Sequence, residues 1–201
     1  MFSLLLFDWP SKNSDFNMSL ARVRYCTDNF YNLLLKIKKY RSEFLNENQH
    51  FSLLCHSLGN YFLTHLVVNG NNQYLKEKFI DNIIMNAPAV RSKKNAEVIS
   101  QLAFQERIYI TFNKRDFVLK GAGFITTSRM LGNRILEPLA SNASYFDFSP
   151  VAEREHTYLP DITSLNMMYH LCSISIIQLF MVNMWMLIMK CFNLKKRTAF
   201  L

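Results

Sequence analysis

A serine follows a short apolar run in the stretch Leu-Leu-Cys-His-Ser-Leu-Gly-Asn at residues 53–60. The small residues Cys55 and Gly59 lie two positions before and two positions after Ser57. A nucleophilic serine at a sharp strand-to-helix turn needs this pattern, because the strand and the helix approach each other closely there. The stretch therefore predicts a nucleophile at Ser57. The alternative is a plain turn in which Ser57 only caps the following helix.

Two later loops supply the partners that such a serine requires. A serine hydroxyl becomes nucleophilic when an imidazole takes its proton, and a carboxylate must orient that imidazole. Asp116 follows a predicted strand, and His156 lies in a loop after the last predicted strand, which gives the order serine, acid, histidine. The alternatives are a solvated loop charge for Asp116 and a surface histidine for His156. The backbone amide of Leu58 is expected to supply half of an oxyanion hole.

The other histidines are weaker candidates for the base. His56 is the neighbour of Ser57, so its side chain should diverge from the serine. His65 is expected to pack inside the following helix, and His50 starts the strand at the opposite end from the site. The reserve candidates are His170 as the base, and Asp147 and Glu155 as the acid.

Alternating apolar patterns predict the elements that position these residues. Strands followed by helices are typical of a mostly parallel sheet of α/β type, flanked by helices. Ser14 or Asp15 is expected to cap the first helix, and Gly70 to end the second. A loop is expected around Gly121 and Gly123. The predicted strands are 2–8, 50–55, 79–88, 107–113 and 143–149, and the predicted helices are 16–45, 57–70 and 96–104.

Composition narrows the classes of partner. Half of the 201 residues are hydrophobic, which excludes a disordered chain. The net charge of +8 comes from scattered cations without a nucleic-acid-binding motif, so no nucleic-acid partner is expected. The cysteines have no metal-binding spacing and are expected to be buried, reduced thiols, and neither a metal nor an organic cofactor is needed. They are Cys26, Cys55, Cys172 and Cys191.

Several stretches together resemble the α/β-hydrolase superfamily, and most closely a bacterial branch of uncharacterised serine hydrolases. The resemblance covers about residues 2–165 and implies Asp116 as the acid and His156 as the base. The turn around Ser57, called the nucleophile elbow, is shared by the whole superfamily. The Trp-Pro-Ser stretch and the stretch around His156, called the histidine loop, are specific to fewer of its members. The matching stretches are DWPS at 8–11, CHSLGN at 55–60, MNAPAV at 85–90, ITFNKRDFVL at 110–119 and EHTYL at 155–159.

The resemblance also implies that the first strands of the fold are missing. Residues 2–8 correspond to the fourth strand of the complete fold, so the first three strands would lie upstream. The third strand normally lies between the fourth strand and the nucleophile strand, and its loop carries the second oxyanion amide. Residues 1–168 are therefore expected to form a partial domain. Its central strands would have to pair in a new way or leave open edges, and its activity would be weak.

The end of the chain has a different composition. Residues 171–189 are almost continuously apolar, and Lys190, Lys195, Lys196 and Arg197 follow. Residues 169–201 are expected to form an apolar C-terminal helix with a basic tail. That helix would either span a membrane, with the protein facing the cytoplasm, or cover the gap in the sheet. A frame-shifted end is the third interpretation.

The main hypothesis is a serine hydrolase, carboxylesterase-like or lipase-like, that acts on a small-molecule or lipid ester through Ser57, His156 and Asp116. The expected location is the cytoplasm or the cytoplasmic side of a membrane. The second hypothesis is a non-catalytic remnant of such an enzyme with a binding or membrane-associated role. The identity of the substrate and the oligomeric state stay open.

Overall fold

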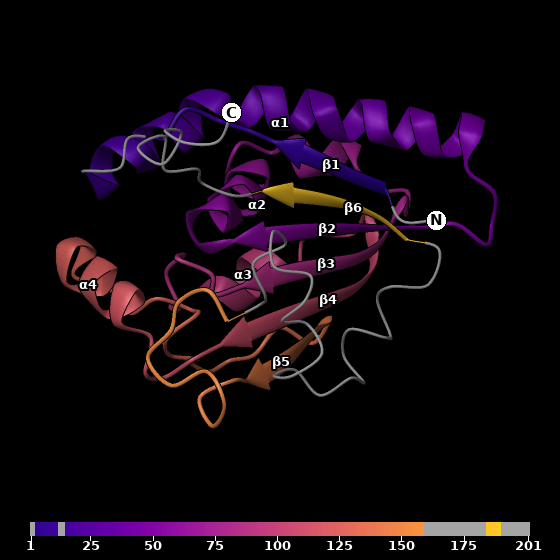
Figure 1. Ribbon diagram of the computed structural model, residues 1–201. Coiled ribbons are helices and arrows are strands. Elements are labelled where there is room, and N and C mark those ends of the chain that lie inside the picture. The colour runs from indigo at the N-terminus through magenta and orange to yellow at the C-terminus, as the bar shows by residue number, and fades with distance from the viewer. Residues whose placement is uncertain (1–2, 12–14, 159–183, 190–201) are drawn as a thin grey trace, which may run out of the picture.

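The computed structural model describes residues 3–11, 15–158 and 184–189, which form a parallel sheet flanked by helices (Figure 1). The strand order is β1-β6-β2-β3-β4-β5, and every neighbouring pair is parallel. The predicted fold class, a mostly parallel α/β sheet flanked by helices, is confirmed. The strands are β1 (Ser3–Phe7), β2 (His50–His56), β3 (Ile80–Asn86), β4 (Gln105–Phe112), β5 (Ala143–Asp147) and β6 (Met184–Met189).

The first two helices lie close to the predicted ranges, whereas the third ends at Ile99 instead of residue 104, and a fourth helix, α4 (Phe117–Thr126), occupies a predicted loop. Asp15 caps the first helix, because its side chain accepts hydrogen bonds from the backbone amides of Asn17 and Met18 at 2.8 and 3.3 Å. Gly70 follows the second helix with a left-handed backbone (φ +75°), as its predicted role at the helix end requires. The helices are α1 (Phe16–Phe44), α2 (Asn60–Val68), α3 (Asn95–Ile99) and α4 (Phe117–Thr126), with 3-10 turns η1 (Ser57–Gly59) and η2 (Asn71–Tyr74).

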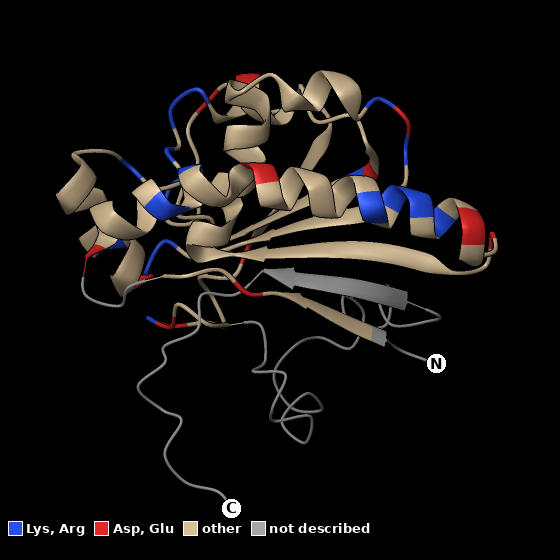
Figure 2. Ribbon diagram, turned by 90° about the horizontal axis from the view of Figure 1, so that it is seen from above, with Lys and Arg blue, Asp and Glu red and all other residues tan. Residues whose placement is uncertain are grey.

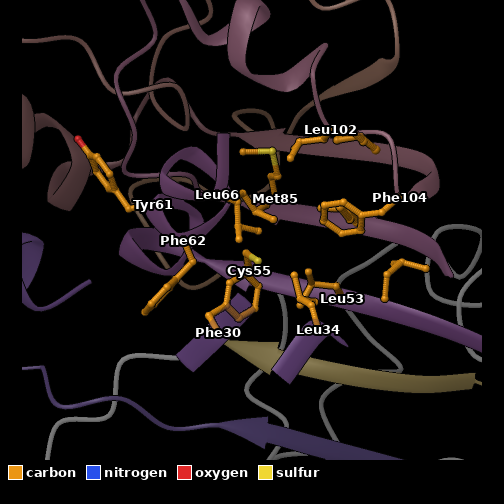
Figure 3. Packing of buried hydrophobic residues seen from close by; sticks show 14 of the residues in the cluster. Phe30, Leu34, Leu53, Cys55, Tyr61, Phe62, Leu66, Met85, Leu102 and Phe104 are labelled. Atoms are coloured by element: carbon orange, nitrogen blue, oxygen red, sulfur yellow. The ribbon is translucent and has the colours of Figure 1, made fainter. Parts of the chain in front are cut away.

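The long helix α1 is amphipathic and supplies much of the core. Charged positions follow its length, whereas the strands beneath it carry few (Figure 2). Phe30 and Leu34 on its buried side are completely enclosed and lie near Leu53 of β2 and Phe62 of α2 (Figure 3). This packing fixes α2, and therefore the turn before α2, relative to the sheet.

Helix α4 occupies the segment in which a loop was predicted. Gly121 and Gly123 suggested a loop, because glycine in a helix costs about 1 kcal/mol relative to alanine. Two features offset that cost. Asp116 caps the helix by accepting a hydrogen bond from the Leu119 amide at 2.9 Å, and Leu119 and Ala122 are buried against the body of the domain.

The prediction of a C-terminal helix is wrong for residues 184–189, which form the central strand β6. This strand fills the position between β1 and β2, where an absent third strand was expected to leave a gap, and Leu187 pairs with Leu5 on one side and Leu53 on the other. A strand in the middle of a parallel sheet is itself a continuous apolar run. A short run of this kind does not distinguish strand from helix by periodicity.

The strand assignment also affects the membrane prediction. A spanning helix over residues 171–189 is wrong, because the last six of those residues belong to the sheet. Among the described residues, no helix is both long enough and apolar enough to cross a bilayer. The remaining residues of the predicted C-terminal segment, 169–183 and 190–201, lie outside the described residues, as do His170, Cys172 and Cys191.

The two cysteines in the described part of the chain, Cys26 and Cys55, are buried free thiols, as predicted. Burial raises the pKa of both, and for Cys26 the nearby Arg22 opposes part of the increase. Both thiols therefore stay protonated at neutral pH and act as small core residues.

The pairing of β6 predicts that its backbone is essential to the sheet. Leu187→Pro removes an amide hydrogen from the middle of a strand that is paired on both sides, which proline does not tolerate there. We expect a loss of about 2 kcal/mol or more in the free energy of unfolding, measured by urea denaturation of the full chain. Leu187→Val keeps the amide hydrogen and is the matched control. Equal stability of the two variants would contradict the placement of β6.

Candidate active site

Ser57 lies at a strained turn between β2 and α2. It begins η1 with a positive φ of +52°, in the left-handed region that residues with a Cβ rarely adopt. The side-chain amide of Asn60 holds the turn by donating to the backbone carbonyls of Cys55 and Ser57 at 3.0 and 2.9 Å. The Ala89 amide donates to the same Ser57 carbonyl at 3.1 Å. The turn therefore has the backbone strain of a nucleophile elbow, and the hydrogen bonds from Asn60 and Ala89 hold it in that conformation.

The structure brings together the three side chains that the sequence singled out. Nε2 of His156 lies 2.8 Å from Oγ of Ser57, and Nδ1 lies 2.6 Å from Oδ2 of Asp116. An ionised carboxylate only accepts hydrogen bonds, so Nδ1 carries the proton and Nε2 is left to accept the serine hydroxyl. Residues far apart in the chain thus form one continuous line of hydrogen bonds.

The acid of this line is completely enclosed. The side chain of Asp116 has no exposed surface, and that of His156 is only 14% exposed. The second carboxylate oxygen, Oδ1, accepts the Leu119 amide at the start of α4. A buried carboxylate must be paired and hydrogen-bonded to be tolerated, and both of its oxygens meet this condition. The carboxylate therefore holds the imidazole at a fixed angle in a largely buried position.

Two asparagines fix the turn that carries the acid, and the sequence analysis missed both. The side chain of Asn113 donates to the carbonyls of Glu153 and Glu155 at 3.1 and 3.0 Å, which ties the histidine loop to the end of β4. Asn133 donates to the carbonyls of Asn113 and Lys114 at 3.2 and 3.0 Å. The only available signal was the run Asn-Lys-Arg-Asp after a strand, which marks a turn but does not name its partners.

A second set of polar side chains lies across the ends of β2, β3 and β4. Asn86 accepts a hydrogen bond from the Thr111 hydroxyl at 2.7 Å, and its amide nitrogen lies 3.0 Å from Nδ1 of His56. The hydroxyl of Tyr158 lies 3.3 Å from that of Thr111. Burial raises the pKa of Tyr158 although the Thr111 hydrogen bond opposes it, so the phenol stays neutral and is able to donate.

This second set contacts the predicted base through His56. The rings of His56 and His156 are tilted by 46° with centroids 4.9 Å apart. From the sequence, the side chain of His56 was expected to diverge from Ser57, and no role was predicted for it. In the structure its ring packs against the ring of His156, whose Nε2 contacts Ser57.

The other histidines and acidic residues named as candidates have different partners. His50 contacts Asp81 at the amino end of β2, and His65 is buried in α2 beside Tyr61. Asp147 binds Lys114 and Ser149, and Glu155 contributes its backbone carbonyl to Asn113. Leu58, the predicted oxyanion donor, directly follows Ser57 in η1. Among the described residues, no group of three or more His, Cys, Asp or Glu side chains is arranged to hold a metal ion.

Comparison with known proteins identifies the family. The family described as "Alpha/beta hydrolase of unknown function (DUF900)" matches residues 1–138, and the chain belongs to it. No curated protein and no solved structure matches the chain. The match covers the elbow and the acid turn and ends before His156, so the assignment of the base rests on the geometry given above.

The close contact at Gly132 gives a test of how the acid turn is held. A Cβ at Gly132 would lie 2.5 Å from the carbonyl carbon of Ala87 and 2.6 Å from the nitrogen of Pro88. Gly132→Ala should therefore lower the free energy of unfolding by about 1–3 kcal/mol, as overpacking does. At Gly121 in α4, by contrast, a Cβ would have no neighbour within 4 Å.

Gly121→Ala is the matched control and should stabilise the protein by about 0.5–1 kcal/mol. Urea denaturation measures both changes. A Gly132→Ala variant as stable as the parent would show that the backbone at Gly132, which accepts the Asn113 amide, does not approach residues 87–88 closely.

Proposed function

We propose that the protein is a serine ester hydrolase, carboxylesterase-like or lipase-like. Membership of an α/β-hydrolase family supports hydrolytic activity in general. The observation that carries the more specific proposal is the line of hydrogen bonds from Ser57 through His156 to the buried Asp116. A surface histidine or a solvated loop acid would have no reason to adopt this arrangement.

The roles follow from the geometry. Oγ of Ser57 attacks the acyl carbon of the ester while Nε2 of His156 takes the hydroxyl proton. The same nitrogen then protonates the departing alcohol, and a water molecule, activated in the same way, hydrolyses the acyl-enzyme. Asp116 keeps Nδ1 protonated and stabilises the imidazolium that forms in each step.

The negative charge on the acyl oxygen needs hydrogen-bond donors. The Leu58 amide follows the nucleophile at the start of η1, where backbone amides have no partner within the helix. It is therefore the donor that we assign to the oxyanion. The substrate class that we propose is a small-molecule or lipid ester, and no metal or organic cofactor takes part in these steps.

Rates of p-nitrophenyl butyrate hydrolysis test the proposal. Ser57→Ala and His156→Ala should each lower kcat/KM by about 10⁴-fold or more, because the members of a triad act as a unit. Asp116→Asn should cost about 10³-fold or more, because the imidazole loses its orienting carboxylate.

Matched controls are available in the same chain. Ser42→Ala changes an exposed serine on α1, and His50→Gln changes a histidine at the other end of β2. Both should retain the parental rate. Hydrolysis that survives Ser57→Ala would contradict the proposal. A parental chain with no activity on any ester would favour the non-catalytic remnant instead.

A further inference from the structure

Helix α4 exposes a row of large apolar side chains, which we call the apolar face of α4: Phe117, Val118, Phe124 and Ile125. Phe124 is 85% exposed, Phe117 is 68% exposed, and the other two are more than half exposed. Positions 117, 118, 121, 124 and 125 lie on one side of a helix. Leu119 and Ala122 on the opposite side are buried against Ala87, Ala89 and Met130. Single exposed apolar residues are ordinary, but a contiguous set of this kind marks an interaction surface.

Cations outnumber acidic residues in the chain segment that carries this face, although Glu153 and Glu155 are exposed in the adjoining histidine loop. The segment from residue 112 to residue 134 contains five cations and one acidic residue, Asp116, which is buried against His156. Lys114 is paired with Asp147, whereas Arg115, Lys120 and Arg129 form no ion pair with any described residue. The cations of the segment are Lys114, Arg115, Lys120, Arg129 and Arg134.

The apolar face lies at the edge of the sheet that carries the candidate active site. Asp116 is the N-cap of α4, so the helix begins at the acid itself. Figure 1 shows α4 beyond the carboxyl ends of the strands, projecting from the body of the domain. The Phe117 amide is also 3.5 Å from the carbonyl of Arg154 in the histidine loop. The first turn of this face therefore lies beside the loop that carries His156.

We propose that the apolar face of α4 docks onto an anionic lipid surface. Its phenylalanines and isoleucine enter the boundary between head groups and acyl chains, while the surrounding lysine and arginines contact the acidic head groups. The ten residues of α4 are too few to span a bilayer but suffice for a helix lying in the surface. The unpaired cations favour an anionic lipid surface over an apolar groove on a protein. Removing a cation from water costs free energy unless an acidic group pairs with it, and an apolar groove supplies none.

The docking itself does not depend on the proposed enzymatic function. The consequence of docking does rest on the proposed function. A lipid ester in the surface would lie near the nucleophile, so the docked enzyme would favour lipid esters over soluble esters as substrates. The two claims are separable, because vesicle binding is measured without any chemical step.

Co-sedimentation of the full chain with vesicles tests the docking. The parent should bind vesicles of phosphatidylcholine mixed with phosphatidylglycerol and bind vesicles of phosphatidylcholine alone much more weakly. Phe124→Ser combined with Ile125→Ser should lower the partition coefficient by about tenfold or more, because two apolar side chains no longer leave water. Higher salt should weaken binding of the parent.

Helix α1 offers a matched control for the apolar substitutions. Tyr25 is 86% exposed and Phe44 is 67% exposed, and neither lies on α4. Tyr25→Ser combined with Phe44→Ser should leave vesicle binding unchanged. For the charges, Lys120→Gln with Arg129→Gln should weaken binding to anionic vesicles, whereas Lys36→Gln with Lys76→Gln should weaken it far less.

The Phe124 and Ile125 double variant should hydrolyse soluble p-nitrophenyl butyrate at the parental rate and unfold at the parental temperature or higher. Three results would overturn the docking proposal: no binding of the parent to anionic vesicles, an equal loss in the Tyr25 and Phe44 control, or a parental dimer that the α4 double variant converts to a monomer without any vesicle binding. The last result would identify the face as a protein interface.

Discussion

The buried carboxylate of Asp116 is the constraint on which the rest of the site depends. Its two oxygens hold two different structures, since Oδ1 caps α4 and Oδ2 pairs with His156. A carboxylate without exposed surface is tolerated only while both of its oxygens keep their hydrogen-bond partners. Helix α4 and the histidine loop are thereby required to be in place at once.

Side-chain amides transmit this requirement to the backbone. Asn113 holds the histidine loop, Asn133 holds the acid turn, and Asn60 holds the elbow, each by donating to main-chain carbonyls. Loops are normally the most mobile parts of a domain. Here hydrogen bonds from Asn60 at the start of α2, Asn113 after β4 and Asn133 in the following turn give them fixed positions, which the proposed proton transfer requires.

The three side chains of the candidate site could be named from the sequence, Ser57 by its small neighbours Cys55 and Gly59, and Asp116 and His156 by their order after it. The asparagine anchors and the contact between His56 and His156 could not, because they join residues that are remote in the chain. Helix α4 was not predicted, because Gly121 and Gly123 disfavour a helix locally. The burial of Leu119 and Ala122, which stabilises the helix, depends on residues that are remote in the chain. Strand β6 was missed because a short apolar run carries no periodicity that separates a central strand from a buried helix.

The central claim is that Ser57 is a nucleophile activated by His156. Treating the full chain with a fluorophosphonate and mapping the adduct by peptide mass spectrometry tests it most directly. The structure predicts a single adduct on Oγ of Ser57, which forms far more slowly in His156→Ala because the hydroxyl then keeps its proton. No adduct, or an adduct on another serine with Ser57 unmodified, would contradict the account.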